Sequence, residues 1–410
     1  MNLRTIFGIL PPKLIYSDDN LPIEECSLPQ KSIILQSSED PITLEVGDKL
    51  KSGKKLESCS IETGMFSPVT GTITEISTIK WTDGKEFTAI TIETSGSDEW
   101  DSSLNEGEDL SNKSSEEAQA KLKELGFDLG ISNDKRIDTI IINGLDSDLL
   151  VSKNQQILRE KHENIKEGVE LLKKITGAKR AVLAIPNNIS GLSIGTEITA
   201  VNPVHPNGMS DMLPRLVLTD GEIDNSSVYS VELLNSIVES LKSGKPPVHK
   251  VITLIDKGGK ALKNLRVRIG TPISVVLESN NIAIQDNDKL ILGGPMLGEV
   301  TYLADFPVTH KTEAIYIQDS EEVAPIANIT CINCGKCVDA CPYNLQINLL
   351  GRYSEFSLFE RCEELDIDYC IECGLCAYVC PAGRPLVQYI QFAKHEIKEL
   401  KNKEEEESTQ

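Results

Sequence analysis

The chain has 410 residues, 40% of them hydrophobic, and its 41 basic and 63 acidic side chains give a net charge of −22. This length allows roughly two to four domains with apolar cores, and no stretch reaches the roughly 18 apolar residues of a membrane-spanning helix. The negative charge argues against nucleic acid and anionic lipid as ligands, because their phosphates would be repelled. Any membrane association would therefore come through partner proteins.

The N-terminal region is rich in short β-branched runs separated by glycine and aspartate turns, a pattern that predicts strands. The expected strands cover residues 32–35, 42–44, 71–76 and 87–92. The phrases at 46–53 and 66–73 resemble lipoyl- and biotinyl-type sandwiched hairpins, but no lysine between them matches the one that carries the cofactor in those domains. We therefore predict a scaffold module without a covalent cofactor, followed by a polar linker.

The next region alternates between apolar strands and amphipathic helices. Strands are expected at 137–142, 181–185 and 198–201, and helices at 115–125, 152–176 and 231–241. Gly177 stands where the second helix should end, as glycine commonly does after a last turn. Such alternation predicts a mainly parallel sheet with helices on its faces, an α/β Rossmann-like domain.

From residue 246 the pattern returns to strands, at 251–255 and 265–269, and predicts a small β-rich domain. The full expected fold is multidomain α/β plus β. Its parts are a barrel-sandwich-like module (1–95), a linker (96–115), an α/β domain (116–245), a β-rich domain (246–300), a second linker (301–321), a cluster domain (322–392) and an acidic tail (393–410).

Two cysteine runs near the C-terminus carry the chemistry. Each run follows the pattern C-x2-C-x2-C-x3-C-P, by which bacterial-type ferredoxins hold two cubane iron–sulfur clusters. In that arrangement three thiolates of one run and the remote fourth cysteine of the other bind the same cluster. The predicted ligands are Cys331, Cys334, Cys337 and Cys380 for one [4Fe–4S] cluster, and Cys370, Cys373, Cys376 and Cys341 for the second.

Other uses of these cysteines fit less well. Zinc more often takes two C-x2-C pairs or adds histidine, and no histidine lies between His310 and His395. Disulfides need an oxidising compartment, and no secretory signal is recognisable. Cys26, Cys59 and Cys362 are not claimed by the clusters, and Cys362, which is near the second run but outside the ligand spacing, is interpreted as an ordinary small residue. Reduced thiols beside oxygen-sensitive clusters indicate a cytosolic, anaerobic setting.

Some polar residues outside the motifs have simple structural interpretations. His205 and His249 are isolated in the sequence. We therefore expect each to be a surface residue or a buried histidine with hydrogen-bond partners, rather than a metal ligand. Asp146 and Asp148 are two residues apart and predict a solvated turn rather than an acid–base pair. Gly293 and Gly294 could face a ligand, and a tight turn between strands explains them equally well.

With its domains in this order, the chain resembles the C subunit of the Rnf complex, a membrane assembly that couples electron transfer to ion pumping. The phrases at 266–273 and 292–298 are similar to that family's soluble-ligand-binding β-grasp (SLBB-like) region. The cluster segments 369–380 and 385–389 are similar to its two-cluster ferredoxin-like domain. The resemblance is strong over 246–392 and looser before it.

The sequence departs from the family in the α/β domain, which there binds FMN and accepts hydride from NADH. The family's loop of the type GxGGAGFPT is replaced by residues 125–134, which contain no Gly-Gly pair. Its NAAECEPY-type segment is replaced by residues 143–150, and its YPxGxEKQL-type segment by 205–212. Phosphate cradles need glycine and a free helix N-terminus, and Asp128 and Asp134 would add repulsive charge. The residues therefore predict that FMN and NADH binding is lost.

The resemblance implies an iron–sulfur electron-transfer subunit, peripheral to the cytoplasmic face of the cell membrane and bound to other subunits of the complex. With the nucleotide site degraded, the expected electron donor is a soluble protein such as reduced ferredoxin. Three alternatives stay open: an FMN-containing NADH-oxidising subunit, a related soluble cobalamin reductase, and a docking protein whose clusters take no part in electron transfer.

Overall fold

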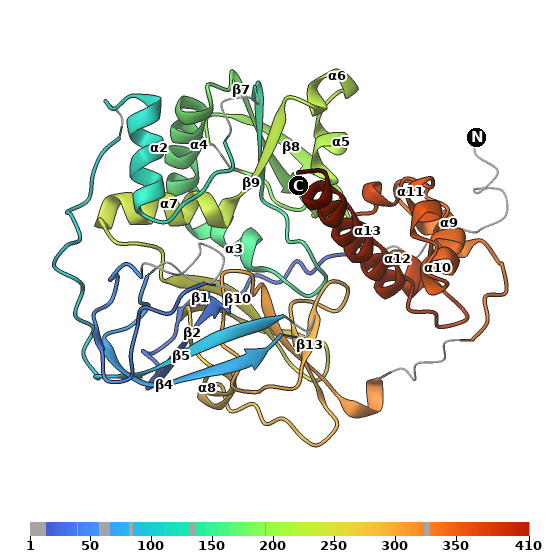
Figure 1. Cartoon of the computed structure of the whole chain (residues 1–410). Coiled ribbons are helices and arrows are strands. Elements are labelled where there is room, and N and C mark those ends of the chain that lie inside the picture. The colour runs from blue at the N-terminus through green and yellow to red at the C-terminus, as the bar shows by residue number, and fades with distance from the viewer. Residues whose placement is uncertain are drawn as a thin grey trace. The chain divides into compact units, whose positions relative to one another are not determined.

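The computed structural model describes residues 14–409 except 39, 57–65, 82–84, 111, 132–135, 193 and 324–328, and of 405–409 it describes the backbone alone. The chain divides into two compact units, one formed by Ile15–Glu322 and the other containing the described residues from Val323 onward. Three sheets belong to the first unit, and the second is helical (Figure 1).

The sheet of the α/β region consists of four parallel strands. Their order is β8 (Glu197–Val201), β7 (Arg180–Pro186), β6 (Thr139–Asn143), β9 (Ser226–Ser230). Ile140 and Ile142 of β6 enter one core, whereas Ile141 between them enters another on the opposite face. Both faces are thus covered, as parallel sheets require, and each fully buried isoleucine contributes about 1.5–3 kcal/mol. The predicted parallel sheet is confirmed.

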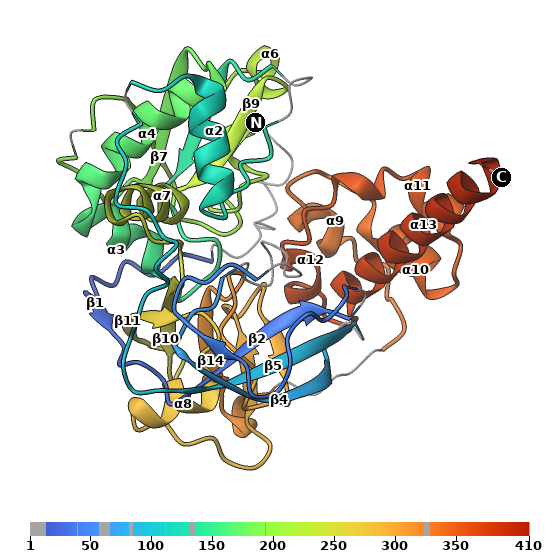
Figure 2. The same ribbon diagram turned by 60° about the vertical axis from the view of Figure 1, so that its left-hand side comes forward.

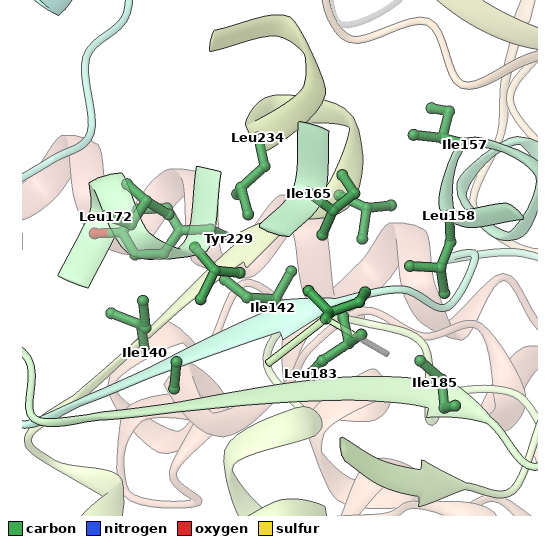
Figure 3. Packing of buried hydrophobic residues seen from close by; sticks show 14 of the residues in the cluster. Ile140, Ile142, Ile157, Leu158, Ile165, Leu172, Leu183, Ile185, Tyr229 and Leu234 are labelled. Atoms are coloured by element: carbon green, nitrogen blue, oxygen red, sulfur yellow. The ribbon is translucent and has the colours of Figure 1, made fainter. Parts of the chain in front are cut away.

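Helices cover this sheet as the apolar periodicity predicts. They are α2 (Ser115–Glu124), α3 (Lys153–Glu160), α4 (His162–Thr176), α5 (Leu213–Val217), α6 (Asp220–Ile223) and α7 (Val231–Ser243). Figure 3 shows Ile157, Leu158, Ile165, Leu172 and Leu234 from these helices gathered over the strand residues Ile140, Ile142 and Leu183. Ser114 and Glu117 form a reciprocal cap at the start of α2.

The expected single helix over 152–176 is wrong, because it is broken into α3 and α4. Lys161, between them, leaves the helical region at φ −121° and ψ 26°. No glycine or proline marks this break, so the sequence gives no signal for it. The end of α4 is as predicted, since Gly177 adopts a left-handed conformation with φ 71°.

The other two sheets are built largely from β-branched runs. An antiparallel sheet has the order β2 (Lys31–Ser37), β5 (Glu86–Thr94), β4 (Gly71–Lys80), β3 (Lys49–Leu50). A mixed sheet has the order β1 (Ile23–Glu25), β11 (Ala261–Arg268), β10 (His249–Ile255), β14 (Ala314–Gln318), β12 (Lys289–Leu292), β13 (Glu299–Thr301), with α8 (Ile273–Ser279) beside it. Ile33 and Leu35 of β2 share one core with Ile252 and Leu265 of the mixed sheet.

Two expectations in this region are wrong. Residues 42–44 form no strand, because the chain there leads into the turn at Glu45–Asp48. The interval 301–321, expected as a linker, contains β14, which pairs with β10 and β12. Its residues Ala314–Ile317 are buried, so this short apolar run is a central strand of the sheet.

A buried ion cluster joins α3 and α7 to the mixed sheet. The ammonium of Lys153, whose side chain is 1% exposed, contacts Glu232 and lies 2.9 Å from Glu313. Lys250 lies 2.7 Å from Glu232 and 3.2 Å from Glu313. Two cations and two anions are therefore balanced within one enclosed site, which buried charges require.

The second unit consists of short helices followed by one long helix. They are α9 (Lys336–Ala340), α10 (Ile347–Glu355), α11 (Phe359–Glu363), α12 (Leu375–Tyr378) and α13 (Leu386–Thr409), with 3-10 turns at Ser320–Glu322, in the first unit, and Ile367–Tyr369. Figure 2 shows α13 running beside α10 and α12. Ala393 and Ile397 are buried in its core, so the acidic tail expected from 393 is instead the continuation of a packed helix.

Candidate iron–sulfur site

The structure brings the eight predicted cysteines together in two crossed sets. Cys331, Cys334 and Cys337 line a cavity of about 420 Å³ together with Cys380 from the other run. A second, tighter cavity of about 20 Å³ is lined by all four cysteines of the other set: Cys341, Cys370, Cys373 and Cys376. Each set therefore takes three cysteines from one run and the fourth from the other.

The donor set suits iron–sulfur clusters. Four cysteines around each space offer the thiolate ligands that [4Fe–4S] clusters use. A cubane in the tighter second cavity would require its lining side chains to move outward. Among the described residues, no three or more His, Cys, Asp or Glu side chains are close enough to hold a single metal ion.

The two cysteine runs also share the same backbone conformation. Positive φ values recur at a constant offset of 39 residues: Asn333 (55°) and Glu372 (56°), Gly335 (77°) and Gly374 (82°), Asn344 (55°) and Gly383 (55°). Left-handed backbone is costly for residues with a Cβ, so its repetition at Asn333 and Glu372 indicates a specific loop shape. Each loop leads into a short helix, α9 or α12, and then into α10 or α13.

Burial favours the protonated form of two of these thiols, Cys337 and Cys373, in the absence of metal. Together with the nearby Cys380 and Cys331, it raises the pKa of Cys337 to about 11. It likewise raises the pKa of Cys373 to about 11, with Cys370 and Cys341 adding to the effect. Because iron binds thiolates, loading of either cavity must release protons.

Two cations next to the cysteines were not predicted from the sequence. Arg384 is 7% exposed, lines the first cavity and lies 2.6 Å from Glu355. Lys394 donates to the carbonyl oxygen of Cys370 at 2.6 Å and contacts Glu372 at 2.9 Å. Lys394 lies on helix α13 between the buried residues Ile390 and Ile397, whereas Arg384 precedes that helix. Such groups hold the cluster loops in place and set their local charge.

The other cysteines lie outside both cavities. Cys362 is fully buried in the core of the second unit, close to the Ser354 hydroxyl at 3.6 Å. Cys26 is half-buried, and Cys59 lies outside the described residues.

The crevice at the carboxyl end of the parallel sheet is where a nucleotide would be expected. From β6 the chain continues to β7 on one side of it, whereas the later strand β9 lies on its other side. In open parallel sheets, ligands bind beyond the carboxyl ends of the strands at the point where the strand order reverses in this way. Asp146 occupies the nearest helix N-terminus: its carboxylate accepts from the backbone N–H of Asn154 at 2.8 Å and from the Gln155 amide at 3.0 Å. The chain's own carboxylate therefore takes the place that a phosphate would need.

The prediction of a solvated turn at Asp146 and Asp148 is wrong, because each is only 1% exposed. Burial raises the pKa of Asp146 to about 6 despite its hydrogen bonds. Asp148 accepts from the backbone N–H groups of Met296 (3.1 Å) and Leu297 (2.7 Å). Gly294 is needed beside it, since an added Cβ would lie 2.5 Å from the Asp148 carboxyl carbon. Sequence spacing could not show that the partner of Asp148 lies about 150 residues away.

The remaining family-specific positions also make internal contacts. Gly126, in the segment that replaces the glycine-rich loop, packs against Phe66, and an added Cβ would lie 2.8 Å from that ring. Asp128 accepts from the N–H of Gly130 at 3.0 Å, whereas Asp134 lies outside the described residues. His205 is buried with its Nδ1 3.4 Å from the Tyr16 hydroxyl, which agrees with a satisfied core histidine. His249 is partly buried.

Comparisons with known proteins agree with this site. Residues 330–384 match the family model described as a 4Fe-4S dicluster domain. The C subunit of the ion-translocating oxidoreductase complex of Pectobacterium atrosepticum is 28% identical over 96% of this chain, which spans 62% of that protein's length. No described helix is both long and apolar enough to cross a bilayer.

Two further relatives match along nearly their whole length. The C subunit of the proton-translocating ferredoxin:NAD(+) oxidoreductase complex of Clostridium ljungdahlii is 27% identical over 92% of this chain and 90% of that protein. The C subunit of the Na(+)-translocating ferredoxin:NAD(+) oxidoreductase complex of Acetobacterium woodii is 26% identical over 95% and 96%. Over most of its length the chain is similar to C subunits of ion-translocating, Rnf-type oxidoreductase complexes.

Proposed function

We propose that this chain is an iron–sulfur electron-transfer subunit that holds two [4Fe–4S] clusters. The observation that carries the proposal is that each crossed set of four cysteines lines its own cavity. Cys331, Cys334, Cys337 and Cys380 would hold one cluster, and Cys370, Cys373, Cys376 and Cys341 the other. Each cluster would supply a site that accepts and releases one electron at a time.

The assembly and donor follow from the relatives. The subunit would be peripheral to the cytoplasmic face of the membrane and would bind other subunits of a complex that couples electron transfer to ion translocation. Reduced ferredoxin is the proposed donor. The names of the relatives from Clostridium ljungdahlii and Acetobacterium woodii, both ferredoxin:NAD(+) oxidoreductases, support ferredoxin as a redox partner.

Those same names include NAD(+) and favour a second candidate, a subunit that reacts with NAD(H), for which the family resemblance implies FMN as cofactor. The residues of this chain do not fit that cofactor. Asp146 already caps the N-terminus of α3, and Lys153 is neutralised by Glu232 and Glu313. A phosphate would face a buried carboxylate, so flavin and NADH are not included in the proposed function.

The finer domain identities belong to the same proposal. The hairpin β4–β5 within the antiparallel sheet supports a sandwiched-hairpin module for residues 1–95. The antiparallel pair β10–β11, with α8 packed beside it, supports a β-grasp identity for residues 246–300. The parallel sheet supports a Rossmann-like identity for 116–245.

The deciding experiment is the cofactor content of protein purified without oxygen. We expect about eight irons and eight sulfides per chain and no flavin, with cluster reduction by reduced ferredoxin but not by NADH. Cys26→Ser is the matched control and should retain all the iron, because Cys26 lines neither cavity. Stoichiometric FMN with bleaching by NADH would establish the second candidate instead.

A further inference from the structure

The two halves of the cluster domain present their cysteines differently to solvent. Cys331 and Cys334 of the first set are exposed. Cys373 and Cys376 of the second set are only 8% and 7% exposed. The first cavity therefore opens to the surface beside two exposed cysteines, whereas the four cysteines of the second cavity are buried or half-buried.

Apolar side chains surround the opening of the first cavity. Ile332 and Phe356 both line it and are each 64% exposed. Ile329, 56% exposed, is joined to the same rim by a hydrogen bond from its N–H to the carbonyl oxygen of Ala382. Large exposed apolar groups gathered in one place commonly mark a protein-binding surface. We call Ile329, Ile332 and Phe356 the apolar rim.

Charge distinguishes this opening from its duplicate. Lys336 and Arg352 are exposed on the first half, and neither pairs with an acid among the ion pairs of the described residues. At the same offset of 39 residues the second half has the uncharged residues Leu375 and Gln391. Conversely, Ile329 and Asn333 of the first half correspond to Asp368 and Glu372. At these four positions the first half carries two positive charges and its duplicate two negative ones.

We propose that the apolar rim, with Lys336 and Arg352, is the docking surface for an acidic electron-carrying protein. This inference rests on the proposed function, because it assigns the partner's position over the cluster held by the first cysteine set. On docking, the partner's reduced centre loses one electron and that cluster gains it, with no bond made or broken. Cations beside the opening attract a negatively charged carrier despite the chain's overall charge of −22.

The test uses the full chain with both clusters and an acidic two-cluster ferredoxin as the probe. Stopped-flow absorbance gives the second-order rate constant for cluster reduction at low (~0.02 M) and high (~0.5 M) salt, where screening differs strongly. We expect Lys336→Glu with Arg352→Glu to lower this rate constant about tenfold at low salt. The difference should nearly vanish at high salt. Phe356→Ser should slow the reaction at both salt concentrations.

The matched control is Lys398→Glu with Lys403→Glu, the same change of charge on α13. Lys398 lies 12 residues beyond Leu386 of the first cavity, roughly 18 Å along the helix axis. This control should change the rate constant less than twofold. A basic cytochrome c, used as an electron acceptor from the reduced chain, should react faster with the double variant at Lys336 and Arg352.

The outcomes separate the two proposals. Absence of iron, or of a paramagnetic signal after dithionite, would refute the proposed function itself. Intact clusters with a rate constant unchanged by all the rim substitutions would refute the docking surface alone. If the rate constant of the double variant is lowered by the same factor at high salt as at low salt, the docking surface is also refuted. That result would indicate a changed cluster potential rather than a lost attraction between the proteins. Binding of anionic lipid vesicles lost in the double variant, with electron transfer unaffected, would assign the surface to a membrane instead.

Discussion

Replacing Glu232 by glutamine removes one of two carboxylates that balance Lys153 and Lys250 inside the first unit. Burial by itself would raise the pKa of Glu232, but the two lysine ammonium groups outweigh this and hold it at about 2, against an ordinary value of 4.5. At about 1.4 kcal/mol per pKa unit, the ionised carboxylate contributes roughly 3 kcal/mol to stability. We therefore expect Glu232→Gln to lower the free energy of unfolding by about 3 kcal/mol at pH 7.

The pH dependence has a definite sign. The folded chain holds Glu232 ionised at pH values where the unfolded chain would protonate it. Its contribution is therefore complete above about pH 4.5 and is lost as the pH falls toward 2. The difference between wild type and variant should accordingly be largest near neutrality and should shrink below pH 4.5.

Tryptophan fluorescence during urea denaturation measures this loss directly. The chain's two tryptophans, Trp81 and Trp100, both lie in the first unit, so their signal follows the unfolding of that unit. The control is Glu86→Gln, which breaks an exposed pair with Lys80 and should cause no measurable loss. If Glu232→Gln were no more destabilising than this control, the balanced buried charges would not stabilise the fold as described.

Three further predictions address the cluster cavities and the first unit. Cys334→Ser and Cys373→Ser should each reduce the iron content from about eight to about four per chain; unchanged iron in either would contradict the ligand assignment. His249 should remain neutral to about pH 4, because burial, with Arg266 and Arg268, lowers its pKa to about 3. The unfolded chain protonates this histidine near pH 6.5, whereas the folded chain does not. The free energy of unfolding should therefore fall as the pH falls from 6.5 toward 3; an NMR titration of His249 with a midpoint near 6.5 would contradict this. Gly208→Ala should destabilise the first unit by more than about 2 kcal/mol, because an added Cβ would lie 1.9 Å from the Asp146 carbonyl oxygen; an unchanged urea midpoint would show that the loop moves freely.

The sequence predicted best what depends on local spacing. The cysteine runs indicated which four thiols would be brought together, and the structure gathers those same sets. Strands β6, β7 and β8 of the parallel sheet were predicted from their sequence, whereas β9, with three serines among its five residues, was not. Gly177 was recognised as a helix end because only a residue without a Cβ takes its backbone conformation easily.

Features that depend on distant contacts could not be predicted. Asp148 looked like a surface residue because the N–H groups that it accepts belong to Met296 and Leu297. Strand β14 was expected to be a linker because its apolar run, Ala314–Ile317, is short and does not alternate, and only its pairing with β10 and β12 identifies it. Helix α13 continues past residue 393 because Ala393 and Ile397 are buried, although the charged residues around them indicated a tail.

The exchange of Cys341 and Cys380 between the two duplicated loops has a consequence for how this unit matures. Neither loop contains all four of the proposed ligands of one cluster, so neither could retain a cluster if the other were unfolded or deleted. The halves are interlocked, and the polypeptide must bring both together before either metal centre is secure. Assembly of the unit should therefore be an all-or-none event, in which loss of one half releases the iron of both.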